Sequence, residues 1–270
     1  MGNLSENLFE HVRDAFLASD VDEKLQKTRS AAFAFRNGEL ALGDFGTPAA
    51  VEAPGRPERP NLVRAKHVPK RGFGTEAGRA IMMHAIAHIE FNAINLALDA
   101  VQRFEGMPDA FYADWLRIAD EEAYHFELIR AHMRQLGADY GDYDAHDGLW
   151  EMCTKTAHDV LIRMALVPRV LEARGLDVTP GIQKKLTQVG DHNAVSLLDI
   201  ILRDEIGHVE IGNRWFRHCC KQRGLKTDET FFELLDEYYP KGLMGPFNLG
   251  ARKKAGFSER EIALLTQKQS

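Results

Sequence analysis

Two short motifs constrain the fold of this chain more than any other feature. Glu205 and His208 are three residues apart, and Glu122 and His125 repeat the same spacing. Residues three apart in a helix project from one face, so each motif pairs a carboxylate with an imidazole. Two Glu-x-x-His pairs on two helices, together with one glutamate from each of two further helices, form a two-metal carboxylate site in a four-helix bundle.

The first half of such a site is predicted on a pair of long helices. The spacing of apolar residues predicts one helix over residues 76–105, with Glu90 in its apolar stripe, and a second over 109–136. The short loop between them predicts antiparallel packing. Glu90 lies as far before Gly106 as Glu122 lies after it, so the two acids come level across the pair.

The second half is predicted on two later helices. One is expected over residues 148–174, with Glu172 near its end and Gly175 as its stop, and a short segment follows it. The next long helix is expected over residues 191–223 and carries Glu205.

One order is therefore repeated along the chain, a lone glutamate followed by Glu-x-x-His about 32 or 33 residues later. No strand-like alternation of any length occurs, which favours an all-α fold. We predict an antiparallel four-helix bundle over residues 75–224. Residues 1–74 are expected to form N-terminal helices and a Pro/Gly-rich basic arm, and residues 225–270 a C-terminal helical extension packed on the bundle.

The chemistry of these residues predicts two metal ions. Unpaired carboxylates at core positions cost several kcal/mol each, and two divalent cations would remove that cost. A single Glu-x-x-His is usually a solvated pair, but the joint pattern favours ligation. Oxygen and imidazole ligands without thiolates predict iron, with manganese as the alternative. The predicted ligands are Glu90, Glu122, His125, Glu172, Glu205 and His208.

Other polar and aromatic residues receive weaker assignments. Glu121 and Asp204 directly precede the motifs and are placed to accept hydrogen bonds from ligand histidines of the other pair. His84 and His88 are interpreted as part of a polar helix face rather than as a second metal site. Three aromatic residues are interpreted as core residues rather than as redox-active neighbours of the metals: Tyr112, Tyr124 and Trp215.

Composition narrows the class of protein. The longest apolar runs are too short to span a bilayer, and acidic residues in the first 19 positions occupy the place of a signal-peptide core, so a cytoplasmic protein without a membrane partner is expected. Three cysteines provide no even disulfide framework and no zinc-type spacing. A net charge of −6 argues against a wide nucleic-acid surface.

A basic run within residues 56–71 leaves two interpretations open. It is either a solvated linker or a local nucleic-acid surface. In the second interpretation the contacts would come from Arg64, Lys66, Lys70 and Arg71.

The order of the glutamates and histidines resembles that of the ferritin-like di-iron carboxylate superfamily, over about residues 75–224. The runs His146–Glu151 and Leu166–Asp177 resemble a bacterial family called domain of unknown function 455, and this likeness extends over most of the chain. The superfamily implies metal-dependent oxygen chemistry: ferroxidase activity and iron storage, hydroxylation, desaturation or radical generation. A neighbouring branch resembles a tRNA hydroxylase that oxidises an isopentenyl-type adenosine modification.

We therefore expect a di-iron or manganese/iron oxidoreductase that uses O2 to oxidise an organic substrate, either a small molecule or a tRNA. The long additions on both sides of the predicted bundle favour this function over iron storage. The alternatives are a ferroxidase or iron-binding protein without an organic substrate, and a protein that keeps its metal pair for stability. The sequence leaves the electron donor and the oligomeric state open, with a homodimer among the alternatives.

Overall fold

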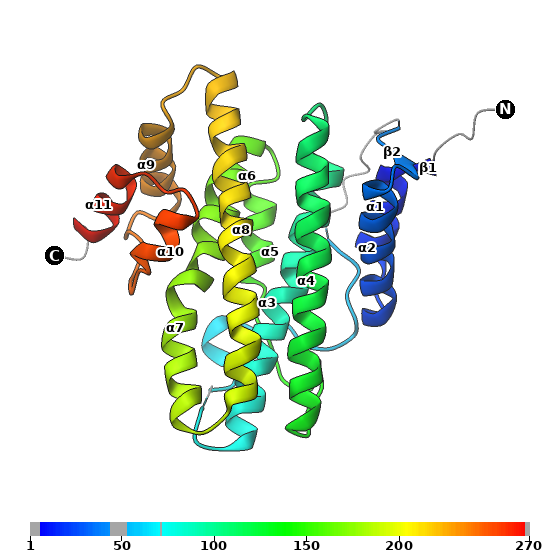
Figure 1. The fold of residues 1–270 in the computed structure, drawn as a ribbon, viewed down its shortest axis with the longest axis vertical. Coiled ribbons are helices and arrows are strands. Elements are labelled where there is room, and N and C mark those ends of the chain that lie inside the picture. The colour runs from blue at the N-terminus through cyan, green and yellow to red at the C-terminus, as the bar shows by residue number, and fades with distance from the viewer. Residues whose placement is uncertain (1–5, 44–52, 71, 268–270) are drawn as a thin grey trace. The chain divides into compact units, whose positions relative to one another are not determined.

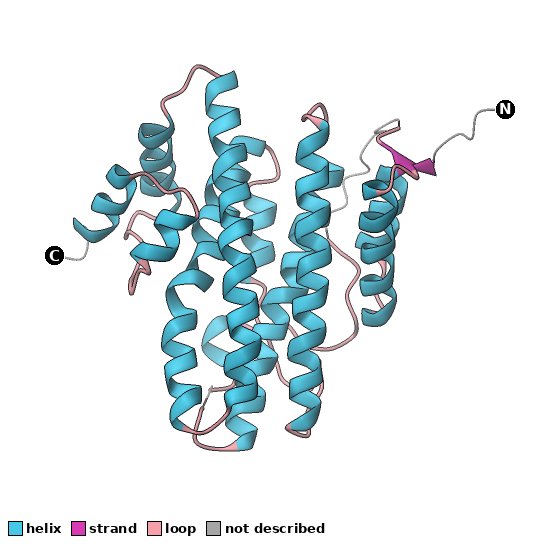
Figure 2. Ribbon diagram, in the orientation of Figure 1, coloured by secondary structure: helices cyan, strands magenta, loops and turns pink. Residues whose placement is uncertain are grey.

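Nearly all regular structure in the described part of the chain is helical (Figure 2). The computed structural model describes residues 6–43, 53–70 and 72–267. The chain divides into two compact units, residues 1–150 and 151–270, and each is described by itself below. The predicted all-α class is confirmed, whereas the four-helix bundle and the boundaries at 75 and 224 stay predictions.

The first unit is built around two long helices, α3 (Glu76–Arg103) and α4 (Asp109–Gln135), which pack side by side (Figure 1). Thr75 begins α3, because its side chain accepts a hydrogen bond from the backbone N–H of Gly78 at 3.0 Å. The turn between the helices uses Gly106 at a φ of +75°, a conformation that glycine adopts without steric cost. Both predicted helices are confirmed to within a few residues.

Two shorter helices cover this pair. The helix α1 (Leu8–Leu17) packs on α3, and α2 (Val21–Arg36) packs on α4. The two-residue strands β1 (Glu6–Asn7) and β2 (Leu40–Ala41) pair in parallel beside them.

The proline-rich segment after α2 is docked on the first unit. The backbone N–H of Val63 donates to the carbonyl of Ala145 at 2.8 Å, and the N–H of Ala145 donates to the carbonyl of Asn61 at 3.0 Å. A single 3-10 turn, η1 (Ala65–His67), follows. Backbone hydrogen bonds therefore hold the arm at Asn61 and Val63 against the loop that contains Ala145, and both interpretations of the basic run stay predictions.

Length and composition would allow α3 to cross a membrane, but 78% of its most apolar window is buried inside the protein. Such burial is typical of the core helix of a soluble protein. The predicted cytoplasmic location stays a prediction.

The prediction of one continuous helix over residues 148–174 is wrong. The first helix ends at residue 155, and the helix that begins after it changes from α-helix to π-helix. Asp159 starts the new helix by accepting the N–H of Leu161 at 2.7 Å. Pro168 has no N–H to donate, and it lies in a stretch of π-helix, a wider winding. The elements found are α5 (Gly148–Lys155), α6 (Val160–Leu166), the π-helix η2 (Val167–Glu172) and α7 (Ala173–Gln188).

The predicted stop at Gly175 is also wrong, since α7 continues through both Gly175 and Pro180. Pro180 cannot donate to the carbonyl four residues earlier, that of Leu176. The side-chain amide of Asn248 donates to this carbonyl instead, at 3.2 Å. Asn248, which is distant in sequence, therefore replaces the backbone donor that the Leu176 carbonyl lacks because of Pro180.

The longest helix of the second unit, α8 (His192–Gln222), packs along α6, η2 and α7 and is capped by Asp191 as predicted. The C-terminal part also packs within this unit, with α9 on α6 and α8, and α10 on α7 and α8. Its elements are α9 (Thr227–Tyr238), α10 (Leu249–Lys254) and α11 (Glu259–Gln267).

A buried arginine ties the C-terminal part to α8. The Arg169 guanidinium stacks over the rings of Phe231 at 3.7 Å and Phe216 at 4.3 Å. Its Nε donates to Asn213 Oδ1 at 2.5 Å, and its Nη2 pairs with Glu261 of α11. The charge of Arg169 is thus matched by a carboxylate, as a buried charge requires.

The π-helix and α8 approach each other most closely at Pro168 and Gly212. A Cβ added at Gly212 would overlap the ring carbons of Pro168. We predict that Gly212→Ala lowers the free energy of unfolding by about 1–3 kcal/mol, the usual cost of overpacking. Denaturant-induced unfolding measures this change.

Gly207, on the same helix, is the matched control. A Cβ there meets no heavy atom within 4 Å, so Gly207→Ala should raise stability by about 0.5–1 kcal/mol through helix propensity. Equal stability of the two variants would contradict a close contact at Gly212.

Candidate metal centre

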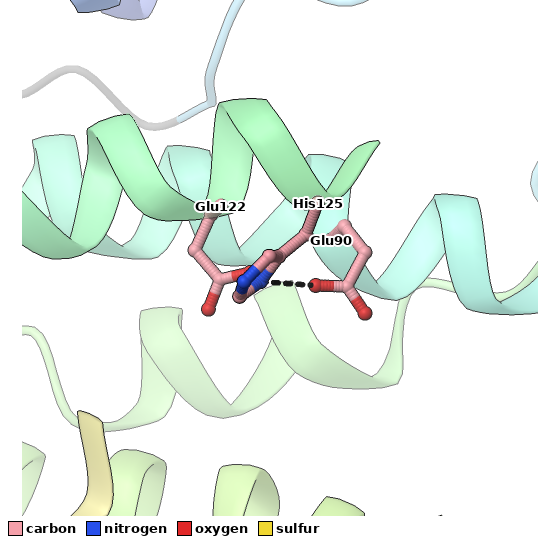
Figure 3. Close-up of side chains that lie close together, drawn as sticks. All are labelled: Glu90, Glu122 and His125. Carbon is pink, nitrogen blue, oxygen red and sulfur yellow. Dashed lines mark hydrogen bonds and ion pairs between the residues drawn. The ribbon is translucent and has the colours of Figure 1, made fainter. Parts of the chain in front are cut away.

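Three of the predicted ligands meet between α3 and α4. Ligand atoms of Glu90, Glu122 and His125 all lie within 4.8 Å of one another. His125 Nδ1 is 3.3 Å from Glu122 Oε2 and 3.5 Å from Glu90 Oε2 (Figure 3). The structure therefore brings these three predicted ligands together in a group that could hold a metal ion, and their role as ligands stays a prediction.

The group is sealed from solvent. Glu90 is 2% exposed, and Glu122 and His125 are 0% exposed. The apolar stripe of α3 around Glu90 is also fully buried, including Ala87 and Ile94. Helical periodicity places a carboxylate within this stripe, so folding brings it out of water together with its apolar neighbours.

Burial and proximity change the protonation of the group. Burial, together with the nearby charge of Glu122, raises the pKa of Glu90 to about 8. Burial alone lowers the pKa of His125, but hydrogen bonds from it to Glu122 and Glu90 and their charges outweigh this effect and raise it to about 12. In the absence of a metal, protons on Glu90 and His125 therefore balance the buried negative charge.

The donor atoms fit a divalent metal ion. Two carboxylates and one imidazole, already close together and dehydrated, form the mixed oxygen and nitrogen set that iron and manganese accept. A cation would replace the protons on Glu90 and His125, because ligands must be deprotonated to bind. Three protein ligands leave further coordination positions for other groups.

The remaining three predicted ligands lie in the second unit and are also buried. Glu172 is the last residue of the π-helix and is 8% exposed. Glu205 is 8% exposed and His208 is 0% exposed, with 3.9 Å between Glu205 Oε2 and His208 Nδ1. Joining these residues to the group in the first unit stays a prediction.

The predicted outer residues are found in other contacts. Asp204 accepts hydrogen bonds from the neighbouring Arg203 at 2.8 and 3.0 Å, and Glu121 lies 4.0 Å from Arg117. Their hydrogen bonds to ligand histidines stay predictions. Of the predicted nucleic-acid contacts, Arg64, Lys66 and Lys70 are exposed, and Arg71 lies outside the described residues.

The aromatic assignments are partly confirmed. Tyr112 and Trp215 are buried core residues, and the Tyr112 hydroxyl donates to the carbonyl of Phe104 at 2.9 Å. Tyr124 is 45% exposed, so its assignment to the core is wrong. Tyr124 lies one residue before the buried His125, so its side chain falls outside the buried stripe of α4.

The polar face of α3 is buried rather than solvated. His84 is 1% exposed and accepts the backbone N–H of Gly141 at 3.1 Å. His88 is 6% exposed, and its Nδ1 lies 2.9 Å from the Tyr140 hydroxyl. Among the described residues neither histidine belongs to a group of three possible metal ligands, and the preference against a second metal site there stays a prediction.

Sequence patterns did not identify Tyr140 as a member of a site, and they placed Arg56 only in the basic run. Both line a pocket between the arm and α3. Their positions in loops carry no periodic signal, and only the docking of the arm brings them together.

The fold and this group define an all-helical protein with a buried carboxylate and imidazole cluster. The chain belongs to the family described as "Protein of unknown function (DUF455)", whose model matches residues 17–263. It is 56% identical over 215 residues to an uncharacterized protein of Haemophilus influenzae, in a match that covers 76% of this chain and 74% of that protein. No solved structure matches. The narrower resemblance is thus confirmed, and the wider one to the ferritin-like superfamily stays a prediction.

The raised pKa of Glu90 predicts a pH dependence of stability in the metal-free protein. The native state keeps a proton that the unfolded chain releases above its ordinary pKa of 4.5. The contribution of Glu90 to stability is therefore full below about pH 4.5 and is lost as the pH rises through about 8. Urea unfolding across this range should show a slope that Glu90→Gln reduces.

Glu105→Gln provides the control, since it removes an exposed acid just after the same helix. It should keep the slope of the parent protein. A slope unchanged in Glu90→Gln would mean that Glu90 does not hold the proton.

Proposed function

We propose that this chain is a ferritin-like di-iron carboxylate oxidoreductase that uses O2 to hydroxylate or otherwise oxidise an organic substrate. The observation that carries the proposal is the buried group of Glu90, Glu122 and His125, whose ligand atoms lie within 4.8 Å of one another. A manganese/iron pair is the alternative metal content.

In this proposal the second unit completes the centre with Glu172, Glu205 and His208. The repeated order of residues in the sequence supports this, as does the burial of all three side chains. Four carboxylates match the charge of two divalent ions, and each ion receives one imidazole. Two divalent ions would help to offset the cost of burying these further carboxylates, which is several kcal/mol for a buried charge that is not matched.

The protein residues would hold the metals and keep bulk water away. Carboxylates can bind through one oxygen or two, so Glu90 and Glu122 can adjust as other ligands enter. The metals would supply the binding and reduction of O2. The fully buried Ala87 and Ile94 would keep the site apolar and would limit side reactions with water.

A ferroxidase without an organic substrate is the second candidate function, since it would use the same ligands. The long N-terminal and C-terminal additions favour an enzyme with an organic substrate, because they can form a substrate pocket or prevent assembly of a storage cage. Both functions consume O2, so the organic product separates them: O2 consumption stoichiometric with iron, without an oxidised product in a metabolite or tRNA digest, would favour the ferroxidase. A large hollow oligomer that mineralises iron would overturn the enzyme proposal.

A tRNA substrate is one form of the proposal. The exposed Arg64, Lys66 and Lys70 would contact phosphates, and such binding weakens as salt rises. Replacing all three by glutamine should weaken tRNA binding and lower its salt dependence, measured by filter binding or fluorescence anisotropy. Binding that is unchanged, or that does not depend on salt, would remove tRNA from the proposal.

Metal analysis of the purified protein tests the site itself. We predict two metal ions per chain, with most of the metal lost in Glu122→Gln and in Glu205→Gln, because each removes a carboxylate ligand. The control Glu210→Gln lies on the same helix as Glu205 and removes a half-buried acid 3.9 Å from Arg214, so it should keep both ions. Metal retained in both ligand variants would contradict the proposal.

A further inference from the structure

The docked arm carries a run of exposed positive charge. Glu58 is the one acid among residues 56–70, in a chain whose net charge is −6. A local excess of one charge raises the concentration of oppositely charged partners at that surface. Four cations of the arm are exposed and form no ion pair with a described residue: Arg59, Arg64, Lys66 and Lys70.

Exposed aliphatic side chains lie beside these cations. Leu62 on the arm and Ile89 on α3 are each 43% exposed. They belong to one region of the surface, because Leu62 pairs with Ala145 in an isolated bridge and Ala145 lines a small hollow together with Ile89 and Val68. The docking of the arm therefore places apolar residues from two segments next to each other.

The cations surround this apolar region. Val68 lies two positions from both Lys66 and Lys70, and Leu62 lies two positions from Arg64. An apolar centre with a polar rim is the usual anatomy of a protein–protein interface. We refer to this region as the arm surface, with Leu62, Val68 and Ile89 at its centre and Arg59, Arg64, Lys66 and Lys70 at its rim.

The hollow in the arm surface has the size of a side-chain pocket. Its volume is about 30 Å³, and its walls include Ala85, Ile89 and Leu149. Sites for small molecules usually measure about 300–1,000 Å³. Asp144 also lines the hollow, but its carboxylate accepts the side-chain amide of Asn61 at 3.0 Å. The hollow therefore suits one apolar side chain of a protein partner.

Other anionic partners fit the arm surface less well. Proteins that bind single-stranded nucleic acid stack its bases on aromatic rings, and residues 59–70 contain no phenylalanine, tyrosine or tryptophan. Helices that bind an anionic membrane surface are amphipathic and long, whereas the only helix within residues 53–70 is the three-residue turn η1. An acidic folded protein is therefore the favoured partner.

The arm surface lies close to the candidate metal centre. Ile89 directly precedes Glu90 in α3, and Glu90 is 2% exposed. A helix with its side chains is about 10–12 Å across, so a group docked on Ile89 lies within about one helix diameter of the Glu90 carboxylate. Electrons cross such a distance through protein, and the buried group need not open to solvent.

The proposed function requires electrons from outside the chain. When one oxygen atom of O2 enters a C–H bond, the other leaves as water, and forming that water takes two electrons and two protons. A one-electron donor protein must therefore dock twice for each product, and at each encounter the donor is oxidised and the metal pair is reduced. Interfaces of this kind are small and transient, and opposite charges accelerate their formation.

We infer that the arm surface is the docking site of an acidic one-electron donor protein. Carboxylates of the donor pair with the four cations of the rim, and an apolar side chain of the donor enters the hollow beside Ile89. The inference rests on the proposed function, because an oxygen-activating enzyme needs such a donor.

Binding of a plant-type 2Fe–2S ferredoxin, an acidic one-electron donor, to the full-length protein tests this inference. Fluorescence anisotropy should show binding that weakens as salt rises. Replacing Arg64, Lys66 and Lys70 together by glutamine should weaken it at least about tenfold. The control, Lys184, Lys221 and Lys241 replaced by glutamine, removes as many exposed charges from the second unit and should change binding less than about threefold.

Ile89→Ser tests the apolar centre. It should weaken ferredoxin binding about threefold to tenfold without loss of thermal stability, because the side chain is 43% exposed. Equal weakening in the control variant, or no binding of ferredoxin by the parent protein, would overturn the inference. Tighter binding of tRNA or of phosphatidylserine vesicles at the same salt, unaffected by Ile89→Ser, would also overturn it in favour of that partner.

Reduction of the iron-loaded protein separates this inference from the proposed function. Reduced ferredoxin should reduce the variant without Arg64, Lys66 and Lys70 at least about tenfold more slowly than the parent protein, whereas dithionite, which needs no docking surface, should reduce both equally. Equal rates with ferredoxin would overturn the docking site alone. Iron that neither reductant reduces in the parent protein would contradict the proposed function, and the inference with it.

Discussion

The structure of the first unit depends on one constraint, the burial of ionisable side chains between α3 and α4. Glu90 and Glu122 approach one imidazole in a space closed to water, so their charge must be balanced by protons or by a cation. The raised pKa values of Glu90 and His125 are the signature of balance by protons. If stability were the only requirement, apolar residues would be expected at these positions, because well-packed apolar side chains often give a higher free energy of unfolding than a buried ionic group does. The arrangement could therefore hold a metal ion.

The opposite side of α3 is covered by the loop after α4, and the docked arm lies beside it. This side is also polar, and it is buried: His84 and His88 contact the loop after α4, and Asp99 pairs with Arg103 at 2.6 Å. A helix with polar residues on two faces cannot be covered by apolar packing alone, so the covering segments must supply hydrogen bonds. The tyrosine- and aspartate-rich loop supplies them, and the docked arm closes the pocket beside it. The arm of this extension therefore lines one side of that pocket.

The sequence alone predicted those features that depend on local periodicity. The stripe that carries Glu90, the Glu-x-x-His spacing and the caps at Thr75 and Asp191 follow from helical geometry, and all were found. The continuation of α7 through Pro180 could not be predicted, because the amide that satisfies the free carbonyl belongs to Asn248. The pocket at Arg56 could not be predicted for a similar reason: it arises where a segment without periodicity docks on a helix. Periodicity carries information about one helix face, whereas these features depend on contacts between distant segments.

The two halves of the repeated pattern differ in the backbone that carries the lone glutamate. Glu90 lies in the middle of an uninterrupted α-helix, where hydrogen bonds on both sides fix the direction of its side chain. Glu172 ends a π-helical stretch, and a π-turn changes the rotation per residue, so the direction of this side chain depends on how the stretch is held. The contact of Pro168 with Gly212 and the buried stacking of Arg169 hold it from two sides. The same residue order thus requires different support in each unit: continuous helix in the first, and packing against α8 and the C-terminal helices in the second. This difference gives the C-terminal extension a physical role, because its aromatic residues and Glu261 stabilise the arginine three positions before Glu172.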